Sequence, residues 1–109
     1  IQAAMKGACE VPLEVMQHCV AVIGIAKNAV TCGNKNAVSD GAAGAELCRA
    51  AMRVASYNVT INLGAIQDEA YVREARTKMD EMQYMGTAVA NDVDSFVNDQ
   101  WNPTPAAGS

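Results

Sequence analysis

Apolar residues recur at intervals of three and four along almost the whole chain, and this spacing limits the fold more than any other feature. About twenty alanines and six methionines supply much of the apolar content, whereas aromatic residues make up only 5%. Side chains of these types favour helix over strand. The sequence therefore predicts an all-α fold, an antiparallel helical bundle with one long C-terminal helix. Because an Ala-rich core buries little apolar area per residue, we expect dimerisation to complete it.

Turn residues divide the helical pattern into segments. Residues 1–9 are typical of the end of a helix, and Pro12 suits the first turn of a second helix that runs to about Thr31. Gly33 favours a helix end, because glycine can adopt the left-handed conformation found there. The segment 33–40 is rich in Asn, Ser and Asp and predicts a polar loop.

Two more helices are expected after this loop. The first spans about 41–63 and ends at Gly64, and its glycines and alanines at 41–45 permit close approach by another helix or a ligand. Asp68 is the expected cap of the second, which runs to about Asp99.

The 109 residues are enough for one domain, which we place at residues 1–100, with an irregular tail over 101–109. The chain begins with Ile1, so we expect a fragment, a processed product or an incomplete reading frame. No uncharged apolar run is long enough to span a bilayer, the nearest being Val20–Ala26, and we expect no membrane partner.

The net charge of −4 disfavours nucleic-acid binding by bulk electrostatics, since only eight Lys and Arg are present, and we expect no nucleic-acid partner. The four cysteines are spaced by ten, thirteen and sixteen residues beside a single histidine, which argues against a zinc site. We expect them to be buried, reduced thiols in a cytoplasmic protein.

Few side chains suggest catalysis by their type alone. His18 and the adjacent Cys19 point about 100° apart on a helix, so they do not form a nucleophile–base pair. Arg49 and Arg53 lie one turn apart and either bind a carboxylate or form a solvated face paired with Glu46. The methionines are expected to fill the core.

Asparagine and aspartate form two more informative groups. The first is Asn34, Asn36, Ser39 and Asp40, just before a predicted helix. These residues either cap that helix, through Ser39 or Asp40, or bind a ligand at its free N–H groups. The second is Asn58 and Asn62, four residues apart in an otherwise apolar stretch.

Three runs of residues carry a resemblance to a known family. They are Val11-Pro12-Leu13-Glu14-Val15, Gly33-Asn34-x-Asn36-x-x-Ser39-Asp40, and Asn58-Val59-x-Ile61-Asn62-Leu63 followed by Asp68-Glu69. In order and spacing the chain resembles the formiminotetrahydrofolate cyclodeaminase and methenyltetrahydrofolate cyclohydrolase family. The resemblance implies an all-helical dimer that acts on one-carbon units of tetrahydrofolate, with no metal or redox cofactor.

The resemblance covers only the C-terminal half of such a domain. The family's Asp-x-Asp-Ala stretch has no counterpart here, and we do not transfer its role to Asp92-Val93-Asp94. The tail Pro103-Thr104-Pro105 echoes the family's Gly-rich turn, through a permuted or tandem arrangement or by coincidence.

The sequence thus predicts a folate enzyme, or a piece of one, that hydrolyses 5,10-methenyltetrahydrofolate or deaminates 5-formiminotetrahydrofolate. We expect Asp40 to handle a proton or contact the pterin ring, unless it only caps a helix. Asn34, Asn36 and Ser39 are expected to line the pocket for the folate substrate, with Asn58 and Asn62 facing it. The alternative is a non-catalytic module that forms a homodimer or higher homo-oligomer through the Met-rich stripe of the last helix.

Overall fold

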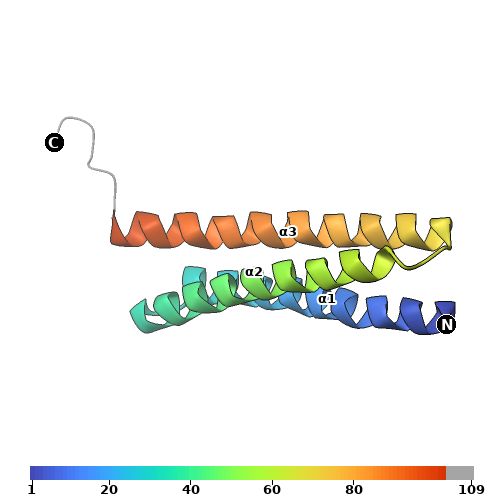
Figure 1. Ribbon diagram of the computed structural model, residues 1–109. Coiled ribbons are helices and arrows are strands. Elements are labelled where there is room, and N and C mark those ends of the chain that lie inside the picture. The colour runs from blue at the N-terminus through green and yellow to red at the C-terminus, as the bar shows by residue number, and fades with distance from the viewer. Residues whose placement is uncertain (103–109) are drawn as a thin grey trace, which may run out of the picture.

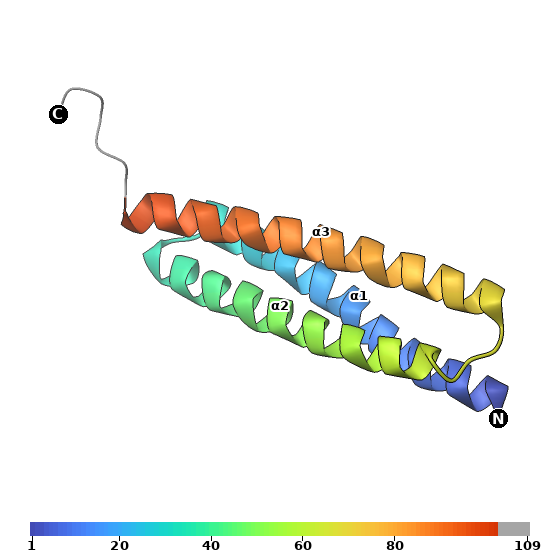
Figure 2. The same ribbon diagram turned by 45° about the horizontal axis from the view of Figure 1, so that its top comes forward.

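The computed structural model describes residues 1–102, which form three long helices and no strand. Helix α1 spans Gln2–Cys32, α2 spans Lys35–Leu63 and α3 spans Glu69–Trp101. Short connections make each helix antiparallel to the preceding one, as Figure 1 shows. In the turned view of Figure 2, α1 lies behind α2 and α3, so each helix contacts the other two. The predicted all-α bundle with a long last helix is confirmed.

Helix α1 is continuous, so the expected break before Pro12 is wrong. Pro12 is buried inside the helix, ten residues after its first residue. Proline has no backbone N–H, so it cannot donate to the carbonyl oxygen of Ala8, four residues earlier. The Asn62 side chain donates to that oxygen instead, at a distance of 3.2 Å. The helix therefore passes through Pro12 because a neighbouring helix satisfies the exposed carbonyl.

The connection between α1 and α2 is much shorter than the predicted loop over 33–40. Asn34 is the N-cap of α2, and its Oδ1 accepts hydrogen bonds from the backbone N–H groups of Asn36 and Ala37, each at 3.0 Å. Neither Ser39 nor Asp40 is a cap, since both lie within the helix. Gly33 does end α1, but in an extended conformation rather than a left-handed one. Glycine is required there because a Cβ would meet the carbonyl oxygen of Ala29.

The core lies where the three helices meet. Its largest fully buried side chains are Met16, Ile23, Val30, Met52, Val59, Leu63 and Val93. Gly41 brings α2 close to α1, since a Cβ there would lie 2.7 Å from Val30 Cγ1. The close approach expected for the Gly-Ala stretch is therefore made by a helix.

The ends of α3 follow the sequence closely. Asp68 caps the helix as predicted, with its Oδ1 accepting from the N–H of Tyr71 at 3.1 Å. The helix continues to Trp101, two residues past the expected end at Asp99, so the first residue of the predicted tail is helical. Residues 103–109 of that tail, with its Pro-Thr-Pro sequence, lie outside the described residues.

Helix α1 is long and apolar enough, by length and composition alone, to cross a membrane, with a mean hydropathy of 1.4 over its most apolar 18 residues. This differs from the expectation that no segment would qualify. The core helix of a soluble bundle passes the same test, and one side of α1 packs against α2 and α3. The finding is therefore weak support for a membrane span.

A second side of α1 and α2 carries exposed apolar residues, and we call it the outer face. On α1 it consists of Val11, Val15, Val22 and Ile25, and on α2 of Leu47, Val54 and Ile61. The α2 residues recur every seven positions, the spacing of a seam that packs against another helix. They are 72%, 57% and 73% exposed, so the described residues leave this seam uncovered.

Candidate functional site

The first turns of α2 hold four of the six predicted site residues. Asn34 caps the helix, while Asn36, Ser39 and Asp40 lie on its first two turns and are exposed. Among residues 1–102, the side-chain carboxylate of Asp40 has no hydrogen-bond partner and forms no salt bridge. Its carboxylate is therefore available to a ligand, and the helix does not depend on it.

Asn58 and Asn62 lie toward the other end of α2. They line a hollow of about 490 Å³ between α1 and α2, on the outer face. Its other walls are apolar: Ala8, Val11, Pro12, Val15, Ala51, Val54 and Ala55. Asn62 is committed to the carbonyl oxygen of Ala8, as described above, whereas Asn58 is exposed.

The six predicted residues do not share one pocket within this chain. Eighteen residues separate Asp40 from Asn58, which is about 27 Å along a helix. The sequence places both groups on α2, and a straight helix holds its ends apart. Within a single chain, Asn58 and Asn62 therefore lie apart from Asp40, and their place beside it stays a prediction.

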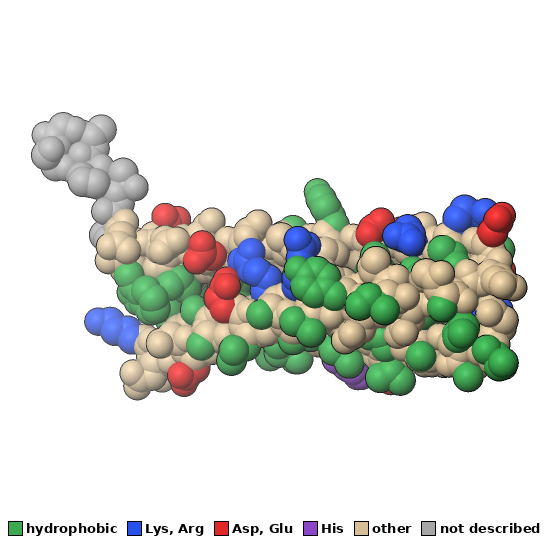
Figure 3. Space-filling view, in the orientation of Figure 1, with side chains coloured by type: hydrophobic (Ala, Val, Ile, Leu, Met, Phe, Trp, Pro, Cys, Tyr) green, Lys and Arg blue, Asp and Glu red, His purple; other side chains and the backbone are tan. Residues whose placement is uncertain are grey.

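A groove between α2 and α3 was not predicted. One part, of about 310 Å³, is lined by Ser39, Ala42, Ala43, Glu46, Val93, Asp94, Val97, Asn98 and Trp101. The adjoining part, of about 340 Å³, is lined by Glu46, Arg49, Ala50, Arg53, Gln83 and Thr87. Figure 3 shows charged side chains gathered where these two helices lie side by side. Among its residues, the sequence analysis had singled out Ser39, the small residues at 41–45 and the Arg49–Arg53 pair, but had not brought them together.

Tyr71 forms a second cluster, at the N-terminal ends of α1 and α3. Its hydroxyl donates to Glu10 Oε1 at 2.6 Å, and Lys6 lies over its ring at 5.1 Å from the centroid. Burial, and then the Glu10 carboxylate, raise the pKa of Tyr71. Lys6 also pairs with Asp68 at 2.8 Å. These contacts fasten the first turns of α3 to α1.

The cysteines and His18 do not form a reactive group among the described residues. Cys9 and Cys19 are buried as expected, and burial raises the pKa of each thiol. Cys32 is exposed, so the expectation that all four would be buried is wrong. His18 is largely exposed and lies 3.9 Å from Glu14. Residues 1–102 contain no group of three or more His, Cys, Asp or Glu that could hold a metal ion.

Comparison with known proteins gives the family. The model of the formiminotransferase-cyclodeaminase family matches residues 1–81. The chain belongs to that family. The methenyltetrahydrofolate cyclohydrolase of Methylorubrum extorquens is 35% identical over 74 residues, which are 68% of this chain and 36% of the relative.

A solved structure shows the same arrangement of helices. The crystal structure of formiminotetrahydrofolate cyclodeaminase from Thermotoga maritima matches 92% of this chain with a TM-score of 0.88 and 28% sequence identity. The match covers 50% of that relative. As a member of the formiminotransferase-cyclodeaminase family, this chain thus spans about half the length of the solved relative and about a third of the curated one.

Proposed function

We propose that this chain forms part of an enzyme that acts on a one-carbon unit carried by tetrahydrofolate. The reaction is either hydrolysis of 5,10-methenyltetrahydrofolate to 10-formyltetrahydrofolate or deamination of 5-formiminotetrahydrofolate with ring closure. The observation that carries the proposal is the match of 92% of the chain to a cyclodeaminase, together with the family model. Both reactions change the bonding at the same carbon, which explains why one fold would serve either.

The proposed reacting end is the start of α2. Asp40 is the candidate to transfer the proton, because a carboxylate can act as a general acid or base beside the reacting carbon. Its exposure and its lack of a partner among residues 1–102 support this role. Asn36 and Ser39, on the same two turns, and the free amide nitrogen of Asn34 would hold polar groups of the ring.

The proposal needs no cofactor beyond the folate substrate and places the enzyme in the cytoplasm. It also includes a second copy of the chain, docked on the outer face. Uncovered apolar side chains at seven-residue spacing favour a helical partner, and an identical copy would present the same seam. The Met-rich stripe of α3 is a poorer candidate, since Met79 is buried within the core.

The test is the decay of methenyl absorbance when the purified chain is mixed with 5,10-methenyltetrahydrofolate. We expect faster decay than in a buffer blank, and loss of that acceleration in Asp40→Asn. Asp80→Asn, which removes an exposed carboxylate from α3, is the matched control and should keep the activity. Since Asp40 does not cap α2, both variants should have the stability of the wild type.

A second assay separates the two reactions. Release of ammonia from 5-formiminotetrahydrofolate would identify the cyclodeaminase reaction. Decay of 5,10-methenyltetrahydrofolate without any release of ammonia would identify the cyclohydrolase reaction. Absence of both activities in a chain shown to be helical by circular dichroism would contradict the proposal for the chain alone.

The second candidate function is a non-catalytic association module. The outer face is the observation that favours it, because helix association needs no catalytic side chain. A stable oligomer that binds no folate would support the module. Saturable folate binding would exclude it.

A further inference from the structure

The groove between α2 and α3 contains two arginines in different states. Arg49 Nη2 pairs with Glu46 at 3.1 Å, and its Nη1 donates to Asn91 Oδ1 at 2.8 Å. Arg53 uses only its Nε, which lies 3.3 Å from the Tyr57 hydroxyl. Among residues 1–102 no carboxylate forms a salt bridge with Arg53, so both of its terminal nitrogens remain as donors.

The wall of this groove also contains unsatisfied polar atoms. Arg49 Nε, a donor, and Gln83 Oε1, an acceptor, are buried without a hydrogen-bond partner. Gln83 Nε2 is already directed to the Thr87 hydroxyl at 3.3 Å. Buried polar groups are normally paired, so this donor on α2 and this acceptor on α3, both in residues that line the groove, favour a ligand that carries both types of group.

A carboxylate next to an amide N–H is such a group. The carboxylate accepts from arginine nitrogens in a two-pronged arrangement, and the amide N–H donates to a carbonyl oxygen such as Gln83 Oε1. Both side chains line the groove with these two atoms beneath its surface, so contact with a ligand requires the side chains to rotate. An N-acylated glutamate therefore matches the chemistry of the groove.

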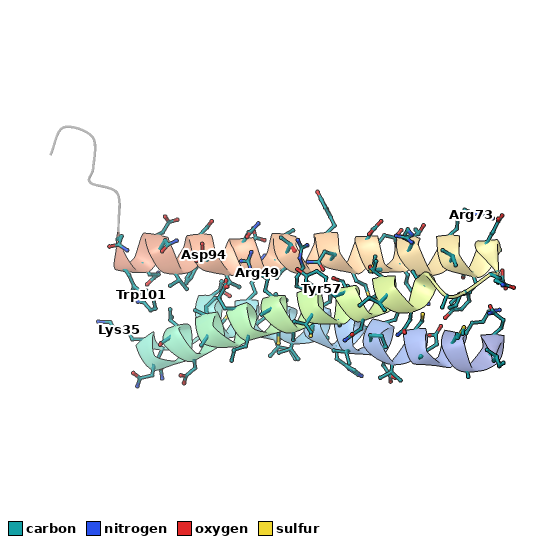
Figure 4. The ribbon with its side chains drawn as sticks, in the orientation of Figure 1. Lys35, Arg49, Tyr57, Arg73, Asp94 and Trp101 are labelled. Carbon is teal, nitrogen blue, oxygen red and sulfur yellow. The ribbon has the colours of Figure 1, made fainter. Side chains whose placement is uncertain are left out.

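The groove also leads away from the proposed reacting end. It runs from Ser39 and Trp101, next to the proposed reacting end, to Arg53. Figure 4 shows Trp101 at the end of α3 near the start of α2, with Arg49 farther along the same pair of helices. Ser39 and Arg53 are about 21 Å apart along α2. This length suits an extended molecule made of a bicyclic ring, a benzoyl group and a glutamate.

We propose that the α2–α3 groove holds the benzoyl-glutamate tail of the folate, with Arg53 binding a glutamate carboxylate. This rests on the proposed function, because the proposed substrate is what supplies the tail. The ring then lies toward Ser39, the residue before Asp40, and the tail runs along the groove toward Arg53. Arg49 is already paired with Glu46 on α2 and with Asn91 on α3, so it holds the two walls of the groove together.

The experiment measures binding of two compounds to the purified chain by calorimetry. One is 5-formyltetrahydrofolate, a stable folate, and the other is 5-formyltetrahydropteroate, which lacks the glutamate. We expect Arg53→Gln to weaken binding of the first about tenfold or more, as for loss of a charge-assisted pair, and to leave the second unchanged. Arg76→Gln removes an equal charge from an exposed position on α3 and should affect neither.

The outcomes separate the two proposals. If the folate binds the wild type and Arg53→Gln equally well, or if both compounds are weakened alike, the tail site is wrong and the proposed function stands. If neither compound binds the wild type, both proposals are overturned. Arg53→Lys should recover only part of the affinity, because an ammonium keeps the charge without the two-pronged geometry.

Discussion

The side-chain amide of Asn62 donates a hydrogen bond to the backbone carbonyl oxygen of Ala8 at 3.2 Å. That oxygen is the one that Pro12 leaves without an intrahelical partner. A side chain on α2 thus satisfies a defect in the middle of α1. This hydrogen bond is a structural reason for an asparagine at position 62, so substrate binding is not needed to explain that residue.

The first prediction concerns Asn62 and Pro12. Asn62→Ala should lower the free energy of unfolding by about 0.5–1.5 kcal/mol, because the exposed carbonyl of Ala8 exchanges its protein partner for water. Pro12→Ala restores the N–H that α1 lacks, so Asn62→Ala should cost less in that background. Urea unfolding of the four proteins measures both effects. Equal costs in the two backgrounds would show that Asn62 acts independently of Pro12.

The second prediction uses two glycines of α2 that are three residues apart. Gly41→Ala should destabilise the fold by about 1–3 kcal/mol, since its Cβ would press on Val30 and lie 3.2 Å from the carbonyl oxygen of Ala26. Gly44→Ala meets nothing within 4 Å and should stabilise by about 0.5–1 kcal/mol through helix propensity. Thermal unfolding followed by circular dichroism measures both. The same sign for both variants would contradict the close packing at Gly41.

The third prediction concerns pH. The hydrogen bond from Lys6, and then the N–H of Tyr71, lower the pKa of Asp68. A lowered folded pKa stabilises the native state above the unfolded value of about 3.9, and this contribution is lost as the pH falls through the folded pKa. Asp68→Asn keeps an N-cap but has no carboxylate. Its Tm should therefore fall less than that of the wild type between about pH 5 and pH 2.

The control for this comparison is Asp80→Asn, which removes an exposed carboxylate with no salt bridge among residues 1–102. Its pH profile should follow the wild type. Identical profiles for Asp68→Asn and the wild type would rule out a lowered pKa at Asp68.

The fourth prediction tests the outer face. We expect the wild type to be a dimer by size-exclusion chromatography with light scattering, and Val54→Asp to be a monomer. A charge at the centre of the seam would be buried without a partner in the dimer. Tyr84→Asp, at a position on α3 that is 81% exposed, is the matched control and should remain dimeric. A folded wild-type monomer would contradict the second copy as the occupant of this face.

Much of the fold was predictable from the sequence because its signals are local. The three-to-four spacing, Gly64 and the Asp68 cap act within one or two turns, and each was placed correctly. Pro12 was misjudged because its effect depends on a distant contact. The 33–40 segment was misjudged because several of its residues can cap a helix, and Asn34 is the one that does. At Pro12 the deciding hydrogen bond comes from Asn62, fifty residues later in the chain.

The candidate site shows the same division. The types and order of residues in three short runs, one of them at the start of α2, were enough to indicate the family. The Arg49–Arg53 spacing also indicated a pair that could bind a carboxylate. Three other features of the site could not be predicted from spacing alone. They are the separation of Asp40 from Asn58, the pairing of Arg49 with Glu46 and Asn91, and the two buried polar atoms that lack hydrogen-bond partners.

The sequence by itself determined that the chain is helical, where most of the helices end and which family it resembles, because these depend on patterns within short segments. Only the tertiary structure decided which faces pack, which carbonyl Asn62 satisfies and where the groove lies. Helix faces meet by side-chain packing across the bundle, and residues that are distant in the chain supply those contacts.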